Sequence, residues 1–382
     1  MTRTMRAAVL VDVNRIELRD VPRQAPAEHE ILIRVEAVGI CGTDLHIAAG
    51  HANYNADSQG RLRPLREFPQ ILGHEIAGVV SEAGSQVRGL APGDRVIADQ
   101  GRNCVSEGRR PCEYCASAAS HQCEQYQEHG ITGLPGGFAE FVTLPGVNAV
   151  RIASDLPAPY AALSEPLGCI LHASDMVSHA TARYGVGRAS ADAVRTVLIC
   201  GGGPAGLLFV QHLRRVARFD GRIIVSEPSA FRRALAEQFG AMTVDPTTSN
   251  LVDAVAELTG GRRAEYVIEA SGAGEVFEEL PGLLRKQGTV LLYGHGHAGV
   301  DLSVMNRVQF LEPTLVSPVG ASGGHDERGR PLTYVRALQL LEDGIVDVRP
   351  LVTHRYESLS ALPDAFAGAH RHPDFVKGVL TL

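Results

Sequence analysis

The chain has 382 residues, which is too long for one ordinary hydrophobic core and predicts two domains. The formal net charge of −7 gives no reason to expect a nucleic acid or an anionic membrane as partner. No run of about 18 apolar residues could span a bilayer, and the N-terminus reads as a strand and not as a signal peptide. We therefore expect a cytoplasmic protein that acts on a small substrate.

Short strands separated by glycine turns dominate the chain up to about residue 155. Ile31, Ile33 and Val35 alternate with polar neighbours, and residues 76–80 are rich in valine and isoleucine. This pattern predicts an irregular β domain, a partly open barrel, whose chemistry lies on loops.

Four chemically active side chains fall within six residues of segment 39–46: Cys41, Thr43, Asp44 and His46. His74 follows in the sequence Gly-His-Glu. A cysteine and a histidine this far apart can meet only through the fold, and together they offer the mixed sulfur and nitrogen ligands that Zn²⁺ prefers. The alternative is that Cys41 is a buried core residue beside a helix start that Thr43 or Asp44 caps.

Four of the seven cysteines follow with the spacing C-x7-C-x2-C-x7-C: Cys104, Cys112, Cys115 and Cys123. Four thiolates can close a tetrahedral zinc shell with no open position, which predicts a structural site. Clustering and an odd cysteine count favour metal ligation in a reducing compartment over disulfides. The first gap is long, so spacing supports Cys104 least, and a loop that merely contains four cysteines is the alternative.

Strands then alternate with helices after residue 165. An apolar strand at 196–200 leads into Gly-Gly-Gly-Pro-Ala-Gly, a helical run to residue 216, and a strand at 222–225. This order is the context that a dinucleotide-binding fingerprint requires, with an acidic residue about 20 positions on. The predicted cofactor-binding residues are Gly201, Gly203, Pro204, Ala205, Gly206, Glu227 and Arg232.

Glu227 is predicted to accept hydrogen bonds from the adenosine ribose. Its charge would repel a 2′-phosphate, which favours NAD over NADP. Arg232 and Arg233 keep NADP as the alternative cofactor. Their other interpretation is a solvated face of the first helical turn.

The remaining pattern predicts a split first domain. Further strands at 266–269, 288–292 and 308–319 would complete a six-stranded doubly wound sheet, and helices near 332–343 and 358–369 with a final strand at 376–382 look like the first domain resumed. The predicted domains are 1–165 with 320–382, and 166–319.

In combination these motifs resemble the zinc-dependent medium-chain alcohol dehydrogenases over nearly the whole chain. The resemblance also rests on Gly136-Gly137-Phe138-Ala139-Glu140 and Glu165-Pro166-Leu167. It implies the α/β class, with a GroES-like β-barrel catalytic domain split by a Rossmann NAD-binding domain. A glutamate at position 165 resembles the polyol (sorbitol-type) and cyclitol branch of this family.

The resemblance implies roles for the candidate site residues. Cys41 and His74 would be catalytic zinc ligands, Glu165 a third or water-bridged ligand, and Glu75 an alternative one. Lys377 resembles a C-terminal basic residue of the family that lies near Glu75 and the cofactor phosphates. An ordinary surface lysine is an equally good interpretation of this residue.

Three further residues of segment 39–46 would serve proton transfer and metal binding. By the same resemblance, Thr43 would pass the substrate proton to His46, and Asp44 would orient His74.

We therefore expect reversible, NAD-linked oxidation of an alcohol, assisted by Zn²⁺, on a polyol, cyclitol or aminocyclitol. The low aromatic content of 5% and the polar loop at 50–68 favour such a substrate. The apolar edge at 313–319 predicts a homodimer or homotetramer. The alternatives are a zinc-free NADPH-dependent enone or quinone reductase and a non-catalytic nucleotide-binding subunit.

Overall fold

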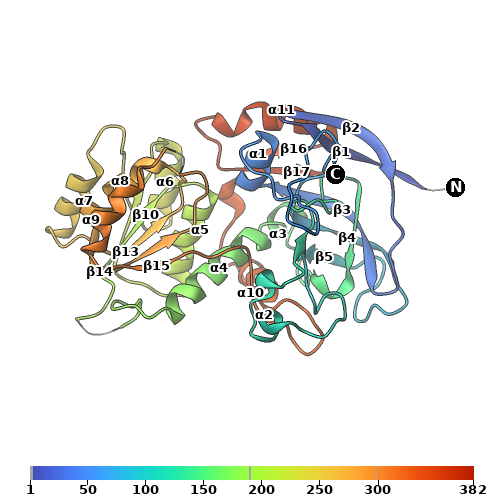
Figure 1. The fold of residues 1–382 in the computed structure, drawn as a ribbon, viewed down its shortest axis with the longest axis horizontal. Helices are drawn as coiled ribbons and strands as arrows, with labels where there is room; N and C mark the ends of the chain where they lie inside the picture. Colours follow the sequence, from blue (N-terminus) through green and yellow to red (C-terminus); the bar gives the residue numbers. More distant parts are fainter. Residues whose placement is uncertain (1–2, 189–190, 298) are drawn as a thin grey trace. The chain divides into compact units, whose positions relative to one another are not determined.

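The structure, a computed structural model, describes residues 3–188, 191–297 and 299–382 and divides the chain into two compact units. The first unit contains Met1–Gly168, Ala321–Gly344 and Val352–Leu382, and the second contains Cys169–Gly320 with Ile345–Leu351 (Figure 1). The second unit thus interrupts the first, and the fold is of the α/β class, as predicted.

The predicted division placed residues 345–351 in the first domain, whereas the structure groups them with the second unit. Val346 and Val348 are buried there. The Gln211 side chain also donates to the carbonyl oxygen of Asp347 at 2.9 Å and accepts from its N–H at 2.8 Å. This paired contact to one backbone residue is not visible in the sequence pattern.

The first unit is built on a seven-stranded sheet, in the order β16-β17-β3-β4-β5-β9, with β8 also paired to β3. Its β-strands and helices are β1 (Thr4–Asp12), β2 (Arg15–Pro22), β3 (Glu30–Ile40), α1 (Gly42–Ala48), β4 (Glu75–Ala83), β5 (Arg95–Ala98), β6 (Gly101–Arg102), α2 (Glu113–Ala116), β7 (Gln127–Glu128), β8 (Phe141–Pro145), β9 (Ala149–Arg151), α3 (Ala158–Ala161), α10 (Leu332–Glu342), β16 (Val352–Tyr356), α11 (Leu362–Ala367) and β17 (Lys377–Thr381). Helix α4 (Ser164–His179) begins in this unit and continues into the second.

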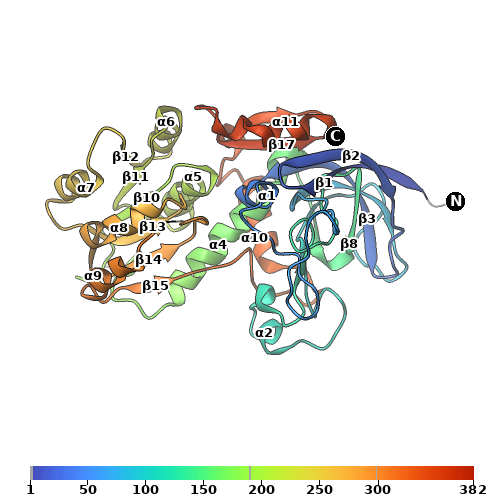
Figure 2. The same cartoon turned by 45° about the horizontal axis from the view of Figure 1, so that its top comes forward.

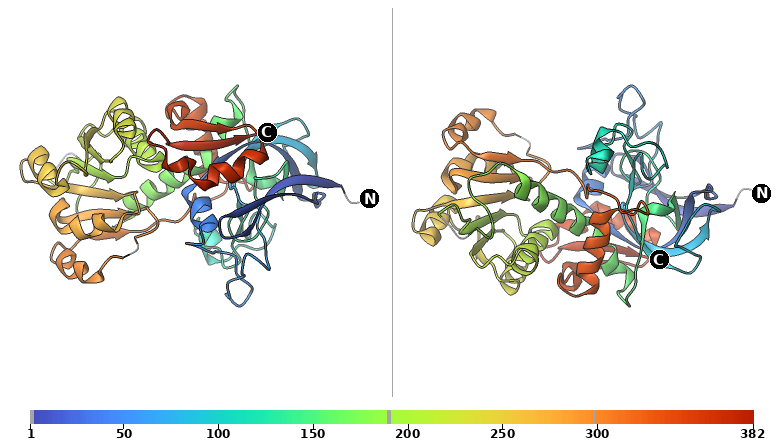
Figure 3. Two further views of the ribbon diagram at one scale, coloured as in Figure 1. Left: turned by 90° about the horizontal axis from the view of Figure 1, so that it is seen from above. Right: turned by 90° about the horizontal axis from the view of Figure 1, so that it is seen from below.

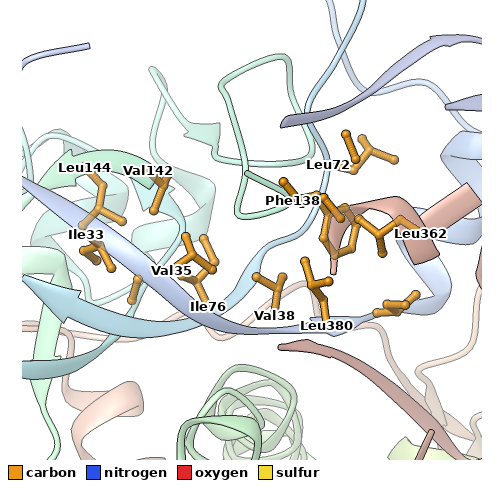
Figure 4. Packing of buried hydrophobic residues seen from close by; sticks show 14 of the residues in the cluster. Ile33, Val35, Val38, Leu72, Ile76, Phe138, Val142, Leu144, Leu362 and Leu380 are labelled. Atoms are coloured by element: carbon orange, nitrogen blue, oxygen red, sulfur yellow. The ribbon is translucent and has the colours of Figure 1, made fainter. Parts of the chain in front are cut away.

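The core of the first unit joins segments from both ends of the chain. Ile33, Val35 and Ile76 from β3 and β4 lie in one cluster with Leu362 of α11 and Leu380 of β17 (Figure 4). Helix α11 also lies against the ribbon of β1 and β2, which Figure 2 shows in dark blue. The returning C-terminal segment is therefore part of this core.

The second unit is a six-stranded parallel sheet, in the order β12-β11-β10-β13-β14-β15. Its β-strands and helices are β10 (Thr196–Cys200), α5 (Pro204–Gln211), β11 (Arg222–Ser226), α6 (Ala230–Gln238), β12 (Met242–Val244), α7 (Leu251–Thr259), β13 (Ala264–Glu269), α8 (Gly274–Leu283), β14 (Leu284–Leu292), α9 (Met305–Gln309) and β15 (Thr314–Val316). The strand order reverses between β10 and β13, so helices cover both faces, with α5 and α6 opposite α8 and α9 (Figure 3). Across the described residues, no helix is both long enough and apolar enough to cross a membrane.

Candidate active site

The site begins where β3 ends, because the next residue, Cys41, is the N-cap of α1. Asp44, at the third position of this helix, is fully buried. Its Oδ2 accepts from the Cys41 N–H at 2.9 Å, and its Oδ1 accepts from the Gly73 N–H at 3.1 Å. One carboxylate therefore ties together the two segments that carry Cys41 and His74.

Strand register brings Glu75 to the same place. The antiparallel pairing of β3 with β4 sets Gly39 opposite Glu75. A β-carbon at Gly39 would lie 1.8 Å from Oε2 of Glu75, so only glycine leaves room for this carboxylate. Sequence patterns predicted a strand here, but not that its last glycine accommodates a side chain of the next strand.

Cys41, His74 and Glu75 form a group, here called the Cys41 cluster, whose ligand atoms all lie within 4.8 Å of one another. His74 and Glu75 are buried, and Cys41 is partly exposed. Oε2 of Glu75 is buried without a hydrogen-bond partner, which is costly unless another group meets it. A thiol, an imidazole and a carboxylate with an unmet oxygen fit a Zn²⁺ ion with an open coordination position.

Charge in this cluster is strongly coupled. Burial lowers the pKa of His74, but the Asp44 carboxylate, with Oδ1 3.4 Å from Nδ1, and the Cys41 sulfur raise it well above its usual value. Lys377 is buried, with Nζ 2.5 Å from Oε1 of Glu75. Burial lowers the pKa of Lys377, and Glu75 more than offsets this, so the pKa is raised. Lys377 is therefore not a surface lysine, the alternative that its sequence left open.

Glu165 lies on the first turn of α4 and is not a member of the Cys41 cluster. Its Oε1 instead accepts from Nε2 of Gln100 at 3.3 Å. The same nitrogen lies 3.4 Å from Oε1 of Glu128, which also accepts from the Tyr126 hydroxyl at 3.0 Å. Direct ligation of a metal by Glu165 stays a prediction.

These carboxyl groups lie in a buried setting that disfavours charge. Burial raises the pKa of Glu128. Burial also raises the pKa of Asp99 to about 8; the Gly101 N–H acts in the opposite direction, and Glu128 and Glu165 add to the rise. A negative charge on one of these carboxyl groups thus disfavours ionisation of its neighbours.

Thr43 and His46 lie three residues apart on α1 and therefore share one face of it. The Cys41 thiol lies 3.8 Å from Oγ1 of Thr43, so this hydroxyl borders the cluster. The His46 ring lies 6.1 Å from the His51 ring, centre to centre. The proton-relay role of the pair stays a prediction.

The four clustered cysteines come together in the first unit. Ligand atoms of Cys104, Cys112, Cys115 and Cys123 all lie within 4.8 Å of one another. The long first gap forms a turn, in which the Asn103 side chain accepts from the Val105 and Ser106 N–H groups and the Cys104 carbonyl accepts from Arg109. The turn brings Cys104, the predicted ligand that spacing supported least, back to the other three.

The glycine fingerprint lies between β10 and α5 of the second unit. Gly201 has a φ of 104°, and Gly206 has no room for a β-carbon, which would lie 1.9 Å from the Gly201 carbonyl oxygen. Gly203 is the N-cap of α5, and a β-carbon there would meet nothing within 4 Å. Helix α5 continues through Pro204 and Ala205 with its first N–H groups next to this open space, which suits a phosphate.

Glu227 lies beyond the end of β11 and is buried against the glycine turn. Its Oε2 accepts from the Gly202 N–H at 2.7 Å, and its Oε1 accepts from the Ser229 N–H at 2.9 Å. Arg232 lies 3.8 Å from Oε1, so the carboxylate is partly neutralised. Glu227 and the fingerprint are thus adjacent, as a ribose-binding acid requires.

Sequence reasoning missed Gln100, Glu128 and Tyr334. Tyr334, fully buried, donates from its hydroxyl to Oε1 of Gln100 at 2.5 Å. The available signal was the polar Asp99-Gln100 pair directly after an apolar strand, since polar residues at strand ends are often functional.

Two family models match this chain. Residues 27–154 match the alcohol dehydrogenase GroES-like domain, and residues 204–341 match the zinc-binding dehydrogenase model.

Individual relatives extend the match. An L-threonine 3-dehydrogenase of Pyrococcus furiosus is 34% identical over 91% of this chain and 89% of its own length. An erythritol/L-threitol dehydrogenase of Mycolicibacterium smegmatis is 31% identical over 90% and 87%. A solved structure from Sinorhizobium meliloti 1021, assigned as a zinc-binding dehydrogenase and bound to NADP, is 31% identical with a TM-score of 0.79 and full coverage of both chains. The chain therefore belongs to the zinc-binding medium-chain alcohol dehydrogenases, which are NAD(P)-dependent oxidoreductases.

Proposed function

We propose that the protein oxidises, reversibly and with NAD, a secondary alcohol that carries a second polar group beside the reacting carbon. Zn²⁺ would be held by Cys41 and His74 together with Glu75 or Glu165. The observation that carries this proposal is the Cys41 cluster, with the buried and unmet Oε2 of Glu75. The Lewis acidity of bound zinc lowers the pKa of an alcohol hydroxyl, and the nicotinamide supplies the hydride acceptor.

The chain's own residues would manage the proton. The Thr43 hydroxyl borders Cys41 and could accept the substrate proton while it donates its own onward. His46, on the same face of α1, would deliver that proton to water. Asp44 supports this arrangement because it fixes both backbone segments that carry the ligands.

The polar surroundings of the Cys41 cluster support a substrate with more than one polar group. Gln100, Glu128 and Glu165 place an amide and two carboxyl groups in one hydrogen-bonded network. The named substrates of the two relatives, threonine and the tetritols, share a carbinol next to an amino or hydroxyl group. Such a pair of groups matches the network better than a simple aliphatic alcohol would.

Glu227 supports NAD as the cofactor, because its position against the glycine turn suits the ribose hydroxyls and its charge disfavours a 2′-phosphate. Arg232 acts in the other direction, and the relative from Sinorhizobium meliloti binds NADP. The ratio of kcat/KM for the two cofactors tests this part of the proposal directly.

The four-cysteine group would hold a second, structural zinc ion. Four sulfur ligands leave no open position for water or substrate. No disulfide joins any of the seven cysteines, all of which lie in the described part of the chain, and this supports a cytoplasmic location.

The edge strand β15 supports a homodimer. It ends the six-stranded sheet, and apolar side chains near it are exposed, with Phe310 at 84%, Leu315 at 45% and Val319 at 50%. Pairing of two such edges would cover both. Light scattering at micromolar concentration should give twice the chain mass, and a monomer would contradict the interface.

The decisive experiment combines metal analysis with a substrate screen. We expect about two zinc ions per chain and NADH formation with a subset of polyols, cyclitols and amino alcohols. Protein that carries no zinc, yet reduces enones with NADPH, would establish the zinc-free reductase instead. Protein with zinc but no turnover of any alcohol would contradict the proposed reaction.

A further inference from the structure

Glu269 ends β13 in the second unit with a carboxylate that is fully buried and bonded on both oxygens. Its Oε1 accepts from the Ser271 N–H at 2.8 Å, from the Ser271 hydroxyl at 2.5 Å and from the Gly272 N–H at 2.9 Å. Its Oε2 lies 2.6 Å from Nε2 of His297, and this nitrogen donates because a carboxylate accepts. A buried carboxylate is costly unless it is bonded in this way, so His297 helps Glu269 to lie here.

Backbone hydrogen bonds tie the loop that follows β14, here called the β14 loop (residues 293–297), to the end of β13. The first two residues after β14 donate from their N–H groups to the Glu269 carbonyl oxygen, at 2.9 and 2.8 Å. The His297 N–H donates to the Gly272 carbonyl oxygen at 2.8 Å. The last residue of the β14 loop is therefore bonded through its backbone and through its side chain.

His297 lies in a backbone conformation that favours glycine, with a φ of 32°. In other residues this conformation is uncommon and costs free energy. The His297 ring is also packed edge-on against the Phe277 ring of α8, with 4.8 Å between the ring centres. A side chain that is kept at a strained position and bonded to a buried acid indicates that its placement matters.

The joined loops lie beside the glycine turn. A β-carbon at Gly201 would lie 3.0 Å from the Ser271 nitrogen, so the loop after β13 packs against the first glycine of the fingerprint. Strand β13 neighbours β10 on the side opposite β11, and a dinucleotide lies across such a reversal in strand order. With the adenosine ribose at Glu227, beyond β11, the nicotinamide half would extend toward the loops after β13 and β14.

We propose that His297 is a positioning residue for the cofactor. Through its bond to Glu269 it fixes the β14 loop in the conformation that receives the nicotinamide half. This inference rests on the proposed function in one respect, the placement of the adenosine ribose at Glu227, and it involves neither zinc nor the identity of the alcohol.

The first test compares the binding of NADH and ADP by calorimetry, because ADP carries the adenosine half and two phosphates but no nicotinamide. His297→Phe keeps an aromatic ring beside Phe277 but cannot donate to Glu269. His297→Gly removes the side chain at a backbone conformation that glycine adopts easily. Both variants should raise the Kd for NADH about tenfold, the effect of losing one hydrogen bond to a charged group, and should change the Kd for ADP by less than about twofold. His297→Gln, whose amide can donate to Glu269, should restore most of the affinity for NADH.

Hydrogen exchange of the β14 loop gives a readout that does not depend on turnover. In the wild-type protein, NADH should protect this loop more than ADP does, and without cofactor the loop should exchange faster in His297→Phe. His179→Phe is the matched control, because His179 is an exposed histidine at the end of α4 whose Nδ1 lies 2.7 Å from the Asp175 carbonyl oxygen. The control should change neither cofactor binding nor exchange in the β14 loop.

The outcomes separate this inference from the proposed cofactor. If His297→Phe and His297→Gly weaken NADH and ADP equally, or leave both unchanged, the positioning role is wrong although the cofactor assignment stands. Equal protection of the β14 loop by NADH and by ADP would also overturn it. Wild-type protein that binds neither ligand contradicts the proposed cofactor and this inference with it.

Discussion

Asp44→Asn tests whether one buried carboxylate assembles the Cys41 cluster. The change is isosteric but replaces one accepting oxygen with a donor, so either the Cys41 N–H or the Gly73 N–H loses its partner. A buried, unsatisfied donor costs about 1–3 kcal/mol, and Asp44 is fully buried. We therefore expect the first unit to lose about 1–3 kcal/mol of stability, together with a 10- to 100-fold loss of zinc affinity.

Hydrogen exchange measured by mass spectrometry locates this loss. Peptides that contain Cys41 and Gly73 should exchange faster in Asp44→Asn, and urea denaturation should give the change in free energy of unfolding. Asp326→Asn is the matched control, because Asp326 also accepts from two backbone N–H groups, those of Arg328 and Arg330, but in an exposed turn where water can replace it. Equal effects of the two variants on stability, with unchanged zinc affinity, would refute the reasoning.

Four further changes give separate tests. Gly39→Ala places a β-carbon 1.8 Å from Oε2 of Glu75, so zinc content should fall and stability should drop by about 1–3 kcal/mol; unchanged metal content by elemental analysis would contradict the close approach. Glu227→Gln should raise the NADP to NAD ratio of kcat/KM by about tenfold, equivalent to about 1.4 kcal/mol, and a wild-type enzyme that already prefers NADP would disprove the assignment. Thr43→Val should reduce turnover by about 10²- to 10⁴-fold with normal zinc content, whereas a loss of only about 1 kcal/mol of stability would mean that Thr43 merely caps α1. The pKa of Asp99 is raised to about 8, so its contribution to stability is complete below about pH 4, where the unfolded carboxyl is protonated, and is lost as pH rises toward 8. Asp99→Asn should therefore flatten the dependence of the free energy of unfolding on pH, measured by urea denaturation between about pH 5 and pH 8. An unchanged pH dependence would contradict the raised pKa.

The sequence predicted the glycine turn of the second unit and the strands on either side of it because their determinants are local. It did not predict β12, and of the strand expected at 308–319 only Thr314–Val316 forms, since residues 308 and 309 end helix α9. The strand at 196–200 matches β10 in both bounds, and the glycines that follow allow a turn with positive φ at Gly201 and close packing at Gly206. Each of these features depends on residues within about 30 positions. Backbone geometry and side-chain size are sufficient to infer them.

The sequence also identified Cys41, His74 and the four cysteines as ligand candidates, since thiols and imidazoles in such patterns have few other uses. Spacing supported Cys104 least, because its long gap to Cys112 closes through the turn at Asn103 and Ser106. Spacing constrains a ligand set only where the connecting loop has one conformation.

Tertiary structure alone decided which carboxylate enters the Cys41 cluster. Glu75 is there because strand register sets it opposite Gly39, and Lys377, about 300 residues later in the chain, meets it from β17. Glu165, which is not part of this group, accepts from Gln100, and Gln100 accepts from Tyr334 of another distant segment. The sequence determined the inventory of reactive groups, but pairing between segments hundreds of residues apart depends on sheet register and burial, which no local pattern encodes.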